Sequence, residues 1–177
     1  MSQTGMNRRQ FLHSSGVAVA GTVAAVGAGT VLIDADGAWA LSLKALDEHT
    51  AKTLVQLCRQ MYPHDRLGDV HYAKVVEGLD GKAAGDPATA KLLTEGVAGL
   101  DQAVGGVKWL HLSDGYKLEA LKRIESTPFF QAVRGAVVTG IYNDPNVWRH
   151  FGYEGSSWEF GGYINRGFDD LAWLKDV

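Results

Sequence analysis

The sequence has few of the residues on which several classes of protein depend. Cys58 is its one cysteine, so the chain forms no internal disulfide and has no Cys-X-X-Cys-His segment for attaching a c-type haem. Seventeen Lys and Arg residues stand against twenty Asp and Glu, which gives a net charge of −3. Because nucleic-acid binding depends on clustered positive charge, we expect no nucleic acid among the partners of this chain.

The remaining composition is that of an ordinary globular protein. The chain has 177 residues, of which 46% are hydrophobic and 21% are charged. This length allows one compact domain with an appendage. Twenty-two glycines but four prolines indicate many turns and few rigid breaks in the chain.

Residues 1–40 have the pattern of an export signal. Arg8 and Arg9 are followed by Phe11 and Leu12. An uncharged run at 14–33 comes next, and the segment ends with an Ala-X-Ala sequence formed by Ala38, residue 39 and Ala40. A positive start, an apolar middle and small residues at the end are typical of a cleaved signal peptide. The arginine pair is typical of the twin-arginine pathway. We therefore predict recognition by the twin-arginine translocase, cleavage after Ala40 and a periplasmic location; a single membrane-spanning anchor is the alternative.

The chain after the signal, residues 41–177, is predicted to form one helical domain. Apolar residues at helical spacing, with caps and prolines at the boundaries, predict helices over 43–62, 69–81, 87–104, 114–124 and 128–141. No stretch shows sustained alternation of apolar and polar residues, as strands would. The predicted fold class is all-α, a small bundle of about five or six helices. Cys58 falls on the apolar stripe of the first helix and is expected to be a small buried residue, with an intermolecular disulfide as the alternative.

The last part of the chain, 141–177, differs from the rest because it gathers nine aromatic residues among glycines. We predict an irregular segment that binds a partner, since aromatic side chains are common anchors of protein interfaces. The equally weighted alternative is that these rings pack over the helical core. The predicted partner-binding residues are Trp148, Tyr153, Trp158, Phe160, Tyr163, Asn165, Arg166 and Phe168.

No catalytic, cofactor-binding or metal site is predicted in this chain. The histidines lack the i, i+4 spacing of a helical zinc site. The acidic pairs Glu154/Glu159 and Asp169/Asp170 leave open a glycosidase, whose chemistry needs two carboxylates, but capping of a terminal helical turn explains the second pair as well.

Three stretches carry a family resemblance: residues 62–65 (Tyr-Pro-His-Asp), the pair Phe129 and Phe130, and above all residues 141–155 with 161–168. In these stretches the chain resembles subunit 3 of gluconate 2-dehydrogenase, the small or gamma subunit of membrane-associated flavin dehydrogenases. The resemblance implies a non-catalytic subunit that binds a large FAD-containing subunit of the glucose-methanol-choline (GMC) oxidoreductase type. It further implies a multihaem cytochrome c as a third subunit, with FAD held by the large subunit.

The resemblance and the predicted export signal at residues 1–40, which we call the leader, together predict an accessory role in a periplasmic sugar, sugar-acid or alcohol dehydrogenase. Twin-arginine export carries folded proteins, so this chain would also escort its flavin-loaded partner out of the cytoplasm. Two alternatives stay open at this point. One is an export chaperone that is released after translocation, and the other is a free-standing periplasmic sugar-binding or hydrolytic protein.

Overall fold

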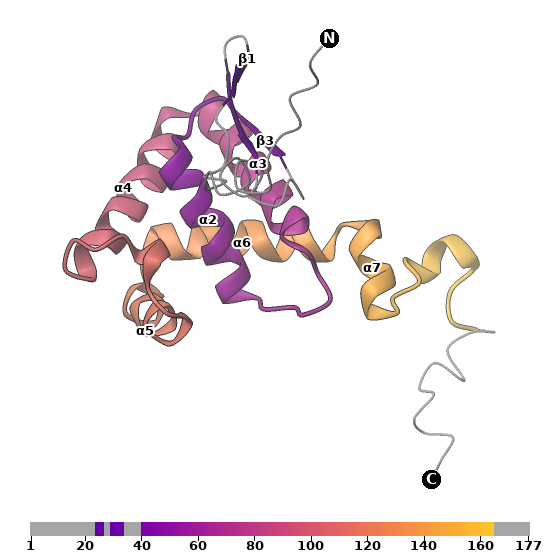
Figure 1. Cartoon of the computed structure of the whole chain (residues 1–177). Helices are drawn as coiled ribbons and strands as arrows, with labels where there is room; N and C mark the ends of the chain where they lie inside the picture. The colour runs from indigo at the N-terminus through magenta and orange to yellow at the C-terminus, as the bar shows by residue number, and fades with distance from the viewer. Residues whose placement is uncertain (1–23, 27–28, 34–39, 165–177) are drawn as a thin grey trace, which may run out of the picture.

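The computed structural model describes residues 24–26, 29–33 and 40–164, which form a small helical body with a C-terminal extension (Figure 1). Its described part confirms the predicted all-α fold. The helices are α2 (Glu48–Met61), α3 (Asp69–Gly85), α4 (Pro87–Ala103), α5 (Asp114–Ile124), α6 (Pro128–Tyr142) and α7 (Pro145–Phe151), with short 3-10 helices η1 (Trp109–His111) and η2 (Ser157–Phe160).

Most helix starts follow from local capping chemistry. The Asp86 carboxylate accepts hydrogen bonds from the backbone N–H groups of Ala88 and Thr89, and Pro87 takes the first helical position of α4. Thr127 and Pro128 do the same for α6. A side-chain oxygen at this position satisfies an N–H that has no partner within the helix. These two starts lie where the sequence predicts them.

Two predicted boundaries are wrong. The first helix begins at Glu48 rather than at residue 43, because Asp47 is its N-cap and accepts the N–H of Thr50 at 2.9 Å. The second helix continues through Gly81 to Gly85. Gly78 and Gly81 are exposed, with no neighbouring atom within 4 Å of where a Cβ would stand. The packing of α3 on three helices therefore outweighs the low helix propensity of these glycines.

The core lies around α3, which packs against α2, α4 and α6. In Figure 1, α2 crosses in front of α6, α3 and α4 lie above α6, and α5 lies at the end of the body opposite α7. Trp109 of η1 is fully buried, and its indole N–H donates to the carbonyl of Lys117 at 3.2 Å. The apolar stripes predicted from the sequence supply most of the core, including Leu54, Leu57, Cys58, Leu93, Val97, Leu100, Val133, Val137 and Ile141.

A small antiparallel sheet, which the sequence analysis did not predict, precedes the helices. Strands β1 (Ala24–Val26), β2 (Gly29–Ile33) and β3 (Ala40–Leu43) pair in chain order. In β3 the side chains of Leu41 and Leu43 are buried, while Ser42 is exposed. An alternation of three residues is too short to be recognised as a strand in the sequence.

Candidate partner-binding site

The segment predicted to bind a partner leaves the body at the turn between α6 and α7. Asp144 is the N-cap of α7 and accepts the N–H of Asn146 at 3.0 Å, with Pro145 at the first helical position. The same carboxylate accepts a hydrogen bond from the ammonium of Lys74 on α3 at 2.8 Å. This bond, followed by the backbone N–H of Asn146, holds the pKa of Asp144 below its usual value. Asp144 thereby ties the start of α7 to the central helix.

Four aromatic rings meet beside this turn and form what we call the Tyr142 cluster: Tyr62, His64, Tyr142 and Phe151. The Nε2 atom of His64 lies 2.8 Å from the Tyr142 hydroxyl. Tyr62 meets Tyr142 edge to face at 6.1 Å between ring centroids, and Phe151 lies 5.0 Å from the His64 ring. Burial, and then the nearby Tyr62, raise the pKa of Tyr142. The cluster joins the loop after α2 to the ends of α6 and α7.

Tyr72, a buried residue of α3, holds the backbone of the loop that carries two members of the Tyr142 cluster. The Tyr72 hydroxyl, on α3, donates to the carbonyl of Tyr62 at 2.6 Å and accepts the backbone N–H of His64 at 3.2 Å. Burial raises the pKa of Tyr72. Its ring also lies beneath the guanidinium of Arg59, 5.5 Å from the ring centroid. The loop that presents Tyr62 and His64 is therefore held in place by the body of the protein.

Trp148 forms the base of the C-terminal arm, a name we give to residues 152–164. Its indole N–H donates to the carbonyl of Tyr142 at 2.7 Å, and its ring meets Tyr153 edge to face at 5.1 Å. Gly155, with φ of +103°, lies so close that a Cβ there would stand 3.3 Å from the Trp148 ring. Trp148 was predicted to contact the partner; the structure makes it half-buried and places it under the arm.

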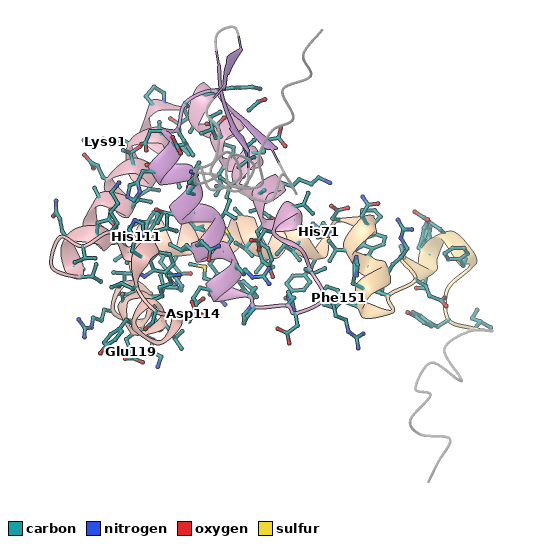
Figure 2. The ribbon with its side chains drawn as sticks, viewed as in Figure 1. His71, Lys91, His111, Asp114, Glu119 and Phe151 are labelled. Carbon is teal, nitrogen blue, oxygen red and sulfur yellow. The ribbon has the colours of Figure 1, made fainter. Side chains whose placement is uncertain are left out.

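The arm presents most of the remaining predicted residues to solvent. Trp158 is 88% exposed, which is exceptional for so large an apolar side chain. The other exposed apolar or aromatic side chains of the arm are Tyr153, Phe160, Tyr163 and Ile164. Figure 1 shows the arm extending away from the helical body beyond α7, and Figure 2 labels Phe151 and His71 on the side of the body from which it extends.

Several predicted residues lie outside the described residues. These are the export-signal residues Arg8, Arg9, Phe11 and Leu12, the residue Ala38 of the cleavage sequence, and the partner-binding residues Asn165, Arg166 and Phe168. Ala40, by contrast, is the first residue of β3.

A groove of about 460 Å³ lies between the end of α2, α5 and the first half of α6. It shares Tyr62 with the Tyr142 cluster, so the two features adjoin. Its lining is mixed in character: Met61, Leu118 and Phe130 are apolar, whereas Lys122 and Arg134 are charged. A second hollow, of about 390 Å³, lies between α3 and the Asp144 turn.

Sequence analysis missed His64 and Tyr142 as a pair, as well as Lys74 and Asp80. The first two are 78 residues apart in the chain, and nothing local to either of them indicates the contact. Asp80 did carry a signal, because it falls on the apolar face of α3 beside Val76 and Ala83 and is itself buried. An acidic residue at such a position needs several hydrogen-bond donors, so its place on the stripe alone indicates a structural role.

Cys58 is fully buried, and burial raises the pKa of its thiol to about 12, which confirms the prediction of a small core residue. Within the described ranges, no group of three or more His, Cys, Asp or Glu side chains is arranged to hold a metal ion. In the same residues, no helix is both long and apolar enough to span a bilayer. Comparison of the chain with protein-family models, curated proteins and solved structures finds no match.

Proposed function

We propose that this chain is the non-catalytic small subunit of a periplasmic, flavin-dependent dehydrogenase complex. It binds a large FAD-containing subunit of the GMC type through the C-terminal arm and the neighbouring Tyr142 cluster. The substrate class is a sugar, a sugar acid or an alcohol, and FAD belongs to the large subunit. A multihaem cytochrome c is the third subunit of the complex.

The exposed aromatic side chains of the arm carry this proposal. Trp158 at 88% exposure, together with Tyr163 and Ile164, presents apolar surface that costs free energy in water. Aromatic anchors of this kind supply most of the binding energy of protein interfaces when a partner buries them. Glycines at 152, 155, 161 and 162 adopt positive φ and give the arm turns that other residues rarely form. An arm of this composition is suited to lie along a partner.

The placement of the residues that carry the resemblance supports the same proposal. Residues 62–65 and residues 142–151 come from distant parts of the chain, and they meet in the Tyr142 cluster. The cluster adjoins the base of the arm through Tyr142, whose carbonyl accepts the indole N–H of Trp148. A partner that covers the arm can therefore contact both stretches at once.

The leader accounts for the second part of the proposal, the escort of the large subunit. A flavoprotein acquires FAD when it folds in the cytoplasm, and the twin-arginine pathway transports folded proteins. A partner bound to this chain would therefore leave the cytoplasm on the signal that begins with Arg8 and Arg9.

Purification of the chain from periplasm and membranes, with an absorption spectrum of what co-purifies, tests the complex. We expect a stable assembly with flavin and haem bands. Recovery of the chain without any partner would favour a free-standing protein, and a partner found in cytoplasmic fractions alone would favour a chaperone that is released after export.

Replacement of Arg8 and Arg9 by lysine tests the escort separately. Lysine keeps the charge but not the planar, forked donors of the guanidinium group. We expect both this chain and the dehydrogenase activity to stay in the cytoplasm. Arg123→Lys, at an exposed position on α5, is the matched control and should leave export unchanged. Unchanged periplasmic dehydrogenase activity in the double variant would contradict the escort role.

A further inference from the structure

The peptide bond at which the leader is expected to be removed lies within the folded part of the chain. Ala40 and Leu41, which flank this bond, are the first two residues of β3. In the antiparallel register with β2, Leu41 pairs with Leu32 and Ala40 with Ile33. The side chains of Leu41 and Leu43 are 1% and 2% exposed, respectively. The helical core therefore begins immediately after the predicted cleavage point.

Asp80 holds the next three residues. Its carboxylate, from the middle of α3, accepts the backbone N–H groups of Lys44 at 2.8 Å, Ala45 at 3.0 Å and Leu46 at 2.9 Å. Asp80 is 1% exposed, so the three N–H groups replace the water that a buried carboxylate loses. Detaching residues 44–46 would break all three of these hydrogen bonds to the Asp80 carboxylate, and each of them stabilises the folded protein. Asp80 thus holds residues 44–46, which directly follow β3, against α3.

A peptidase needs an extended, accessible chain on both sides of the bond that it cleaves. Here Ala40 and Leu41, on either side of the bond, are already paired with Ile33 and Leu32 of β2, and the side chain of Leu41 is buried in the core. Cleavage in the folded protein then requires local opening of β3. Under such conditions the rate of proteolysis follows the small population of the open form.

We propose that the fold itself protects the Ala40–Leu41 bond, so that the folded chain keeps its leader until β3 detaches from α3. This inference rests on the leader assigned under the proposed function, but not on the identity of any partner. Because the twin-arginine pathway carries folded proteins, the exported chain would arrive with the bond still covered. Its leader would be retained, or would be removed slowly, after export.

The test compares two full-length proteins, both folded and in detergent, during incubation with purified signal peptidase. One is the natural chain, and the other has eight Gly and Ser residues inserted between Ala40 and Leu41, which moves the bond out of β3 and leaves the Asp80 contacts intact. Mass spectrometry follows cleavage after Ala40. We expect the insertion to accelerate cleavage at least about tenfold, because the buried Leu41 no longer has to leave the core. A synthetic peptide of residues 30–50 serves as the unfolded substrate and should be cleaved readily.

Asp80→Asn provides a second measurement. The side-chain amide keeps the size of the carboxylate but has a single acceptor oxygen, so its hold on residues 44–46 is weakened and cleavage should accelerate. Glu77→Gln, an exposed change one turn away on α3, is the control and should cleave like the natural chain. If Asp80→Asn does not fold, the insertion variant decides.

Equal rates for the natural chain and the insertion variant would overturn the proposal. Failure of the peptide and both proteins to be cleaved would also overturn it, since the sequence and not the fold would then block the peptidase. No partner is present in this assay, so its failure is separate from a failure of the proposed function.

Discussion

The ammonium of Lys74 and the carboxylate of Asp144 lie 2.8 Å apart and join the central helix α3 to the first turn of α7. Lys74 is largely exposed, whereas Asp144 is buried and also caps α7. This contact fixes the helix from which the C-terminal arm departs. The pKa of Asp144 is lowered by Lys74 first and by the backbone N–H of Asn146 next.

A pH-dependent contribution to stability follows from that lowered pKa. The ionised carboxylate favours the folded state above the pKa that Asp144 has in the unfolded chain, and this contribution is lost as the pH falls through the folded pKa. Asp144→Asn keeps a good cap but removes the charge, so we expect it to lower the free energy of unfolding by about 1 kcal/mol near neutral pH. The difference from wild type should shrink below about pH 4.

Urea unfolding of both proteins at neutral pH and near pH 3 checks this expectation. Asp65→Asn, at an exposed position in the loop after α2, is the control and should change little at either pH. A difference between wild type and Asp144→Asn that persists undiminished at the acidic pH would show that the charge of Asp144 is not its cause.

Trp158 and Trp148 should behave in opposite ways when each is replaced by alanine. Trp158 is exposed on the arm, so Trp158→Ala should weaken binding of the proposed large subunit by about 2 kcal/mol, roughly thirtyfold, without changing the stability of this chain. Trp148 donates to the Tyr142 carbonyl and contacts Tyr153. Trp148→Ala should therefore lower the free energy of unfolding by about 2 kcal/mol.

The measurements are co-purification of the proposed large subunit and thermal unfolding of this chain alone. Tyr163→Ala should have the same effects as Trp158→Ala, because Tyr163 is also exposed on the arm. Tyr116→Ala is the control: Tyr116 is exposed on α5, outside the arm, so this change should affect neither measurement. Lower stability with full binding for Trp158→Ala would mean that its ring belongs to the core, and the assignment of the arm as an interface would be wrong.

Two glycines of α4 offer a matched test of the packing between α4 and α6. A Cβ on Gly96 would stand 2.1 Å from the buried Phe129 ring, whereas a Cβ on Gly99 would meet nothing within 4 Å. Gly96→Ala should therefore cost about 1–3 kcal/mol through overpacking. Gly99→Ala should add about 0.5–1 kcal/mol, because alanine favours the helix. Chemical denaturation measures both, and equal effects of the two changes would contradict the packing described here.

Cys58 should be unreactive in the folded protein. With a pKa near 12 and no exposed surface, its thiol forms almost no thiolate at pH 8. A thiol reagent should modify it only after the chain is unfolded in urea. Modification of the native protein, or a disulfide-linked dimer on a non-reducing gel, would instead support the alternative of an intermolecular disulfide.

Much of the helical fold could be predicted because its signals are local. Asp86 with Pro87, and Thr127 with Pro128, act on backbone groups two or three residues away, so the starts of α4 and α6 are readable in the sequence. The apolar stripes likewise indicate which faces enter the core. The concentration of aromatic residues after residue 141 was enough to predict a distinctive segment there, although the two-turn helix α7 within it was not foreseen.

Tertiary structure alone decided the features that join distant residues. Trp148 supports the arm rather than facing solvent because its indole N–H donates to the carbonyl of Tyr142 at the end of α6. His64 likewise contacts Tyr142, although the two residues are 78 positions apart in the chain. The strand over Leu41 and Leu43, and the extension of α3 past Gly81, exist because neighbouring elements bury them. Helix capping depends on hydrogen bonds between residues within one turn of the chain, so the sequence alone determines where it occurs. Burial depends on which surfaces meet, and it becomes definite once the helices have packed.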